Sequence, residues 1–231
     1  MARDSPAGRP GRHGPDGCSG RGAPLTGLRA LLPALVALLA GAPLPAAADA
    51  RGLADDLREG GHVIYFRHAA TDWSQRDRVT GPGDWTSCDP GEMRQLSDAG
   101  RRQARSVGAA MRALGIPVGA VHASEYCRCV ETAELLDLAR VETTRDLLNA
   151  RAAQYVGGRE ALKGAARRRL ATPPPPGTNT VLVAHGNVFL LAAGERPPEG
   201  GAVVVRPRGG RDFRVLGTVT AADWIALAGD P

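Results

Sequence analysis

Arginine and histidine residues follow apolar, strand-length runs at three places in this 231-residue sequence. Arg67 and His68 end the run VIYF, His185 ends the run VLVA, and Arg128 comes four residues after the run GAVHAS. Charged groups at the end of a buried strand are costly to desolvate unless a partner compensates them. A neutral imidazole can act as a nucleophile, and guanidinium groups bind phosphoryl oxygens in pairs. These residue types therefore predict chemistry on a small oxyanion, with phosphoryl transfer as the first hypothesis.

The elements that position these residues alternate between strand and helix from about residue 53 onward. We predict strands at 62–66, 119–124, 139–144, 180–185, 202–207 and 212–219, and helices at 96–115, 127–138, 159–170, 187–193 and 221–228. This order predicts a three-layer α/β/α sandwich with a mainly parallel sheet and an antiparallel edge hairpin. Ligands of such sheets bind outside the carboxyl ends of the strands, so the histidines and arginines are expected to meet there.

Composition places the chain among ordinary globular proteins, with 43% hydrophobic and 23% charged residues. We expect one domain over residues 51–231. The formal net charge of +5 is spread along the chain, with no basic block that contains interleaved aromatic residues. A nucleic-acid partner is therefore not expected, whereas a preference for small anions is.

The first 50 residues have the order of a secretory leader. Arg29 precedes an apolar stretch, and small residues follow up to Ala50. This pattern predicts a signal peptide cleaved near Ala48–Ala50, and hence an exported protein, periplasmic or secreted. An uncleaved membrane anchor is the alternative. The short apolar run and its prolines argue against it, so we expect no stable membrane insertion after cleavage.

Three cysteines remain after the predicted cleavage, and an oxidising compartment favours a disulfide between two of them. Cys88–Cys127 is the preferred pair and Cys88–Cys129 the alternative. A bridge between Cys127 and Cys129 is less favoured, because residues two apart on a helix point away from each other. Neither a metal site nor a thiol-redox motif is predicted, because further ligands and suitable spacing are missing.

Three segments, FRHAATD, SEYCRCVETAELL and VLVAHGN, resemble the signature blocks of the histidine phosphatase superfamily, which has the phosphoglycerate-mutase-like fold. The resemblance covers roughly residues 60–220 and is greatest to small exported members. It implies a phosphatase that hydrolyses a phosphomonoester through a phosphohistidine intermediate, without metal or cofactor. The implied partner is a phosphorylated small molecule or a cell-envelope sugar phosphate. A mutase is less expected, because mutases usually need additional chain to cover their substrate.

The same resemblance implies a role for each matching residue. His68 would be the nucleophile that becomes phosphorylated. Arg67, Arg128 and His185 would bind the phosphoryl group, and Thr71 could add a hydroxyl group. For Arg128 a plainer alternative remains, namely an ion pair with a glutamate of its own helix.

The proton donor is where this sequence departs from the family. Ala69 and Ala70 replace the usual Gly-Glu, and the region where many relatives carry a glutamate contains Asn149 instead. Glu199, at the start of the last hairpin, is the preferred general acid, and Asp146 is the alternative. If neither serves, the alternative function is a non-catalytic phosphate- or anion-binding module that lacks an efficient general acid.

Overall fold

The computed structural model describes residues 45–229, so the predicted signal sequence before residue 45 lies outside the described residues. Helix α1 (Pro45–Glu59) was not predicted, and the expected cleavage positions Ala48–Ala50 fall within it. Leu53, Ala54 and Leu57 are buried, and the Leu53 side chain lies against Gly217 of strand β6. An alanine-rich segment next to an apolar leader resembles a cleavage region, which concealed this helix. Between residues 45 and 229, no helix is long and apolar enough to span a membrane.

Six strands form one sheet in the order β3-β2-β4-β1-β5-β6. Strands β3, β2, β4 and β1 run parallel, whereas β5 is antiparallel to β1 and pairs with β6 as an antiparallel hairpin. The predicted fold class is therefore confirmed. The strands are β1 (Val63–Arg67), β2 (Val118–Ser124), β3 (Val141–Thr144), β4 (Asn179–Ala184), β5 (Ala202–Pro207) and β6 (Phe213–Val219).

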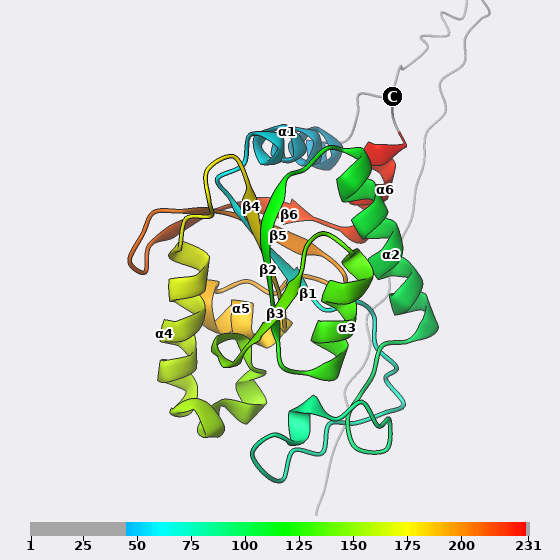
Figure 1. Cartoon of the computed structure of the whole chain (residues 1–231), viewed down its shortest axis with the longest axis vertical. Coiled ribbons are helices and arrows are strands. Elements are labelled where there is room, and N and C mark those ends of the chain that lie inside the picture. The colour runs from blue at the N-terminus through cyan, green and yellow to red at the C-terminus, as the bar shows by residue number, and fades with distance from the viewer. Residues whose placement is uncertain (1–44, 230–231) are drawn as a thin grey trace, which may run out of the picture. The chain divides into compact units, whose positions relative to one another are not determined.

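Helices cover both faces of the sheet, and two apolar cores result (Figure 1). Ile64 and Phe66 of β1 point into the core beneath α1, α2, α3 and α6, whereas Val63 and Tyr65 point into the core beneath α4 and α5. This alternation is the period of a strand that is buried on both faces. The remaining helices are α2 (Asp98–Ala113), α3 (Cys127–Leu136), α4 (Gly158–Ala171), α5 (Gly186–Ala193) and α6 (Ala221–Ala228), with short 3-10 helices η1 (Asp84–Thr86), η2 (Arg145–Leu147) and η3 (Ala150–Val156).

A long loop with a polar, turn-rich sequence connects β1 to α2. The loop is closed at its base, where Thr71 bridges to Leu96 and the Asp72 N–H donates to the Gln95 carbonyl at 3.1 Å. Ser97 then caps α2, because its side chain accepts a hydrogen bond from the Gly100 N–H. The residues between Asp72 and Gln95 therefore form one loop whose two ends are joined to each other.

The strand register brings the candidate residues to one edge of the sheet. Arg67 lies opposite Ala184 of β4, and Val183 lies opposite Ala123 of β2, so the carboxyl ends of three parallel strands coincide. The start of β5 reaches the same edge, because the Gly200 N–H donates to the His68 carbonyl at 3.0 Å. The expected crevice therefore lies beyond the ends of β1, β2 and β4.

Candidate active site

His68 is buried at this edge with a fixed ring orientation. Its backbone N–H donates to the Ala184 carbonyl at 2.9 Å, and its Nδ1 atom lies 2.9 Å from the Ala69 carbonyl oxygen. A carbonyl only accepts hydrogen bonds, so Nδ1 is assigned as the protonated nitrogen of the neutral ring. The Nε2 lone pair is then free to attack an electrophile.

Arg67 extends from the end of β1 toward the turn before β5. Its Nη2 atom lies 2.9 Å from Glu199 Oε1, and Nη1 donates to the Pro197 carbonyl at 3.3 Å. The Thr71 hydroxyl also donates to Glu199 Oε1, at 3.1 Å. The predicted general acid and the predicted phosphate-binding hydroxyl group thus contact each other, and both help to hold Arg67.

Arg128 is fully buried in the first turn of α3, and its main partner comes from the long loop. Its Nη1 and Nη2 atoms donate to the two carboxylate oxygens of Asp77 at 2.8 and 3.0 Å. Nη1 also donates to the Arg94 carbonyl at 3.1 Å. The plainer alternative for Arg128 is therefore wrong, because the helix glutamates pair elsewhere, Glu131 with Arg101 and Glu125 with Arg145.

His185 closes the site from the end of β4. Its ring stands edge-on to His68 with ring centroids 5.4 Å apart, and edge-on to Tyr126 at 4.6 Å. The Ser124 hydroxyl lies 3.2 Å from His185 Nε2, and the Tyr65 hydroxyl donates to the His185 carbonyl. The end of β2 and the middle of β1 therefore fix the second histidine.

Burial decides the charge of both histidines. Burial, and next the positive charge of Arg128, hold the pKa of His68 well below its usual value, and the same two causes lower the pKa of His185. Both rings are therefore neutral near pH 7, which is the form that a nucleophile requires.

Arg67, His68 and His185 line a small pocket of about 110 Å³, which suits one phosphoryl group, whereas Arg128, Thr71 and Glu199 are not among its lining residues. Some of its lining residues were missed in the sequence, notably Asp77 and Arg94, which belong to a loop without periodic pattern. The Arg94 guanidinium stacks 4.0 Å above the Trp73 ring, which fixes it at the pocket. The lining comprises Arg67, His68, Trp73, Asp77, Arg94, Asn149, Arg151, His185, Gly186, Asn187 and Arg196.

Asp146, the alternative acid, lies elsewhere. It pairs with Arg169 at 2.8 Å and lines a different pocket together with His122. Asn149 does line the small pocket, where its amide oxygen accepts a hydrogen bond from Asn187 at 2.8 Å. The carboxylates near His68 are thus Asp77 and Glu199, each paired with an arginine.

Cys88 and Cys127 form a disulfide, which joins the long loop to the residue before Arg128. Cys129 is a free, buried thiol 3.6 Å from His185 Nε2, and burial raises its pKa to about 12. It is therefore protonated and unreactive at neutral pH. Within residues 45–229 there is no cluster of three or more histidine, cysteine or acidic side chains that could hold a metal ion.

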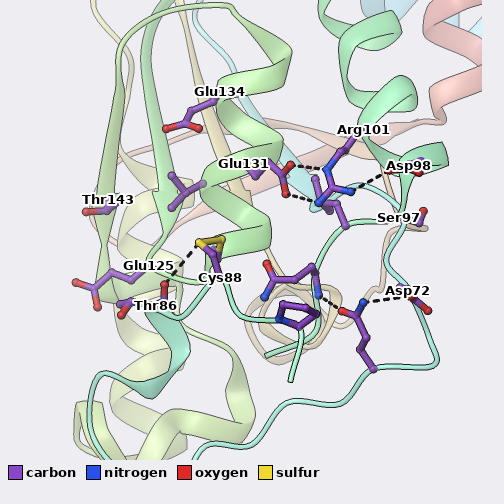
Figure 2. Close-up of a pocket in the computed structure, with 16 residues that line it drawn as sticks. Asp72, Thr86, Cys88, Ser97, Asp98, Arg101, Glu125, Glu131, Glu134 and Thr143 are labelled. Carbon is purple, nitrogen blue, oxygen red and sulfur yellow. Dashed lines mark hydrogen bonds and ion pairs between the residues drawn. A yellow bond between two sulfur atoms is a disulfide. The ribbon is translucent and has the colours of Figure 1, made fainter. Parts of the chain in front are cut away.

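The disulfide also borders a larger cavity of about 960 Å³, which is lined mainly by residues of the long loop, α2 and α3 (Figure 2). Its wall has five acidic residues and one basic residue, Arg101, which pairs with Glu131 and Asp98. Such a surface repels a phosphate dianion. The smaller, arginine-lined pocket is therefore the better candidate for anion chemistry. The acidic residues are Asp72, Asp98, Glu125, Glu131 and Glu134.

Comparison with known proteins identifies the family. Residues 63–173 match the family model of the histidine phosphatase superfamily (branch 1). That segment includes His68 and Arg128, and the residues beyond it complete the same sheet and supply His185. The chain therefore carries a domain of the histidine phosphatase superfamily. A search of curated proteins found no match.

Several solved structures are similar to this chain at low sequence identity. An assigned alpha-ribazole-5'-P phosphatase from Escherichia coli K-12 is 16% identical, covers 70% of this chain and 98% of its own, and has a TM-score of 0.50. A structure named "putative phosphohistidine phosphatase SixA from Agrobacterium tumefaciens" is 18% identical, covers 69% of this chain and 98% of its own, and has a TM-score of 0.43. A mycobacterial glucosyl-3-phosphoglycerate phosphatase is 16% identical, covers 67% of this chain and 96% of its own, and has a TM-score of 0.44. The likeness to the Escherichia coli structure, at 16% identity and a TM-score of 0.50, concerns the fold alone.

Proposed function

We propose that this protein is a phosphatase that hydrolyses a phosphomonoester through a phosphohistidine intermediate on His68. The observation that carries the proposal is the neutral His68 ring, with Nδ1 held by the Ala69 carbonyl, at a small pocket lined by Arg67, Arg94 and His185. A phosphatase of this type needs a fixed, unprotonated nucleophile beside groups that stabilise a phosphoryl transition state.

The reaction has two steps. In the first, Nε2 of His68 bonds to phosphorus while the phosphorus–oxygen bond to the leaving group breaks, and the leaving oxygen takes up a proton from solvent water. In the second, water attacks the phosphohistidine, the nitrogen–phosphorus bond breaks, and inorganic phosphate leaves. Arg67, Arg128 and His185 bind the phosphoryl oxygens and stabilise the charge that they share in each transition state.

Two roles fit Glu199. As the general acid predicted from the sequence, it would protonate the leaving oxygen. As a positioning residue, it orients Arg67, which the contacts with Arg67 and Thr71 favour. In both contacts the carboxylate oxygen Oε1 accepts a hydrogen bond, one from Arg67 and one from Thr71. We therefore propose the positioning role and a preference for phosphate esters with good leaving groups.

The proposed substrate is a phosphorylated small molecule, outside the cytoplasm. The name of one structural neighbour, an alpha-ribazole-5'-P phosphatase, supports a substrate of this kind. The Cys88–Cys127 disulfide supports export, because such bonds persist in oxidising compartments. A cell-envelope sugar phosphate is both a phosphorylated small molecule and located outside the cytoplasm.

Hydrolysis of 4-nitrophenyl phosphate tests the proposal. His68→Ala should lower kcat/KM by roughly a thousandfold or more, because the nucleophile is lost. His122→Ala is the matched control and should retain activity, because His122 lies outside the pocket and contacts Glu142. If His68→Ala hydrolyses the ester as well as the wild type, the proposal is wrong. If the wild type binds phosphate but releases no nitrophenol, the anion-binding alternative holds.

A further inference from the structure

The phosphate pocket opens into a second basic pocket of about 400 Å³. The two pockets share Arg151, Asn187 and Arg196, and Arg159 extends the lining of the second one. No acidic residue lines the second pocket. The site therefore continues outward from the nucleophile as a positively charged path.

The outer arginines differ from the inner ones in their partners. Arg67 and Arg128 each have a carboxylate within 3.0 Å. The side chains of Arg151, Arg159 and Arg196 are exposed and form no hydrogen bond or ion pair with another residue between 45 and 229. Like charges that are gathered without a counter-ion repel one another, and an anionic ligand removes that cost.

The inner and outer groups meet at the first residue of α5. A Cβ atom added to Gly186 would lie 3.0 Å from Arg196 Cγ and 3.1 Å from Arg67 Cδ. Both arginine side chains therefore lie against the same glycine, one on the path outward and one at the phosphate pocket.

The outer pocket is also fixed in place. The Asn187 side chain donates to Asn149 at 2.8 Å and accepts from the Ala150 N–H at 3.4 Å, which attaches the start of η3 to α5. Arg151 therefore stands on an attached segment, and Arg159 belongs to the first turn of α4. Leu190, which is 43% exposed, adds an apolar wall together with Leu191.

We propose that the outer pocket is a binding subsite for a second anionic group of the substrate. The inference rests on the proposed function for the first phosphate. The substrate class is then a phosphomonoester that carries a second phosphate or a carboxylate, joined by a partly apolar linker that contacts Leu190 and Leu191. The chemistry shared by both anions is a group of charged oxygens, which guanidinium groups bind in pairs.

Calorimetric titration of the full-length His68→Ala protein tests the subsite without turnover. The ligands are 4-hydroxybutyl phosphate, 1,4-butanediol bisphosphate and 4-phosphonooxybutanoate. The second anion should tighten binding by about tenfold or more. Arg159→Ala should remove most of this difference. Arg168→Ala is the matched control on the same helix and should retain it, because Arg168 lines a different pocket.

The three ligands also decide which anion the subsite takes. Tighter binding of the bisphosphate alone assigns a phosphate, and equal tightening by the carboxylate assigns a general anion site. Equal binding of all three ligands, no measurable binding of any, or an equal loss in Arg168→Ala would overturn the proposal.

A kinetic comparison separates this proposal from the proposed function. Wild type, Arg159→Ala and Arg168→Ala are assayed on 3-carboxyphenyl and 3-methylphenyl phosphate, whose leaving groups are similar. The wild type should prefer the carboxyl ester by about tenfold in kcat/KM, and Arg159→Ala should narrow that ratio. Hydrolysis of both esters at equal rates would overturn the subsite but not the phosphatase. Binding differences in calorimetry without hydrolysis of either ester would overturn the phosphatase but not the subsite.

Discussion

Asp77 and Arg128 form a bidentate ion pair between the long loop and the first turn of α3, with N–O distances of 2.8 and 3.0 Å. The Arg128 side chain is buried, the Asp77 side chain is 11% exposed, and the Arg94 N–H also donates to Asp77. The loop therefore does more than cover the sheet edge, because it orients one phosphate-binding arginine and carries another. Breaking this pair leaves a buried guanidinium group without a counter-ion, which is strongly destabilising.

Asp77→Asn should lower the free energy of unfolding by roughly 3 kcal/mol. Asp146→Asn is the matched control, because its pair with Arg169 is about one-third exposed, and it should change stability by less than about 0.5 kcal/mol. Urea unfolding measures both values. Inorganic phosphate should raise Tm more in Asp77→Asn than in the wild type, because the anion replaces the lost charge. Equal effects of the two substitutions would contradict the account of Arg128.

Removal of the disulfide should reduce stability and activity together. Cys88 and Cys127 are 39 residues apart, so the double variant Cys88→Ser, Cys127→Ser should lose up to about 4 kcal/mol of stability. Its kcat/KM should also fall, because the bond joins the loop that carries Asp77 and Arg94 to α3. Thermal unfolding and ester hydrolysis with and without reductant provide the measurement. Reductant should have no effect on the double variant, and an unchanged wild type under reductant would contradict the prediction.

The dependence on the leaving group distinguishes the two roles of Glu199. If Glu199 positions Arg67, Glu199→Gln should lower kcat/KM on aryl and alkyl phosphates by the same factor, about 10- to 100-fold. If Glu199 is the general acid, the substitution should instead lower kcat/KM mainly on the alkyl ester, because alkoxide is the poorer leaving group. Thr71→Val should also lower kcat/KM on aryl and alkyl phosphates by the same factor, but by less than Glu199→Gln does. A loss confined to the alkyl ester would restore the acid role.

Stability should fall as the pH falls below 6.5. The folded-state pKa values of His68 and His185 lie well below the usual 6.5, so below that pH the unfolded chain binds protons that the folded protein does not. The unfolding free energy should then drop by up to about 1.4 kcal/mol per pH unit for each histidine, until their folded pKa values are reached. Urea unfolding between about pH 7.5 and about pH 5.5 measures the slope. An unchanged slope in the double variant His68→Asn, His185→Asn would contradict this cause.

Much of the fold could be predicted because its signals are local. The apolar runs that end at Arg67 and His185 predicted two central strands, and the helix predicted at 96–115 corresponds to α2. The ends of parallel strands share one edge of a sheet, so the meeting of His68 and His185 was also predictable.

What the sequence could not provide are contacts that depend on the path of a loop or on distant charges. Asp77 and Arg94 belong to a loop without periodicity, and nothing local marks them as partners of Arg128. Arg151 and Arg196 lie on two further segments that only the tertiary structure brings beside the pocket. Helix α1 was missed because its alanines resemble the end of a leader.

The most direct test of the central claim is to trap the phosphorylated enzyme. Wild-type protein is mixed with radiolabelled aryl phosphate and quenched in alkali, in which phosphohistidine survives and phosphoserine does not. The bound label is then located by peptide mass spectrometry. We predict one phosphate per chain at most, on His68 Nε2, and none in His68→Ala. Label on any other residue, or label that persists in His68→Ala, would contradict the account.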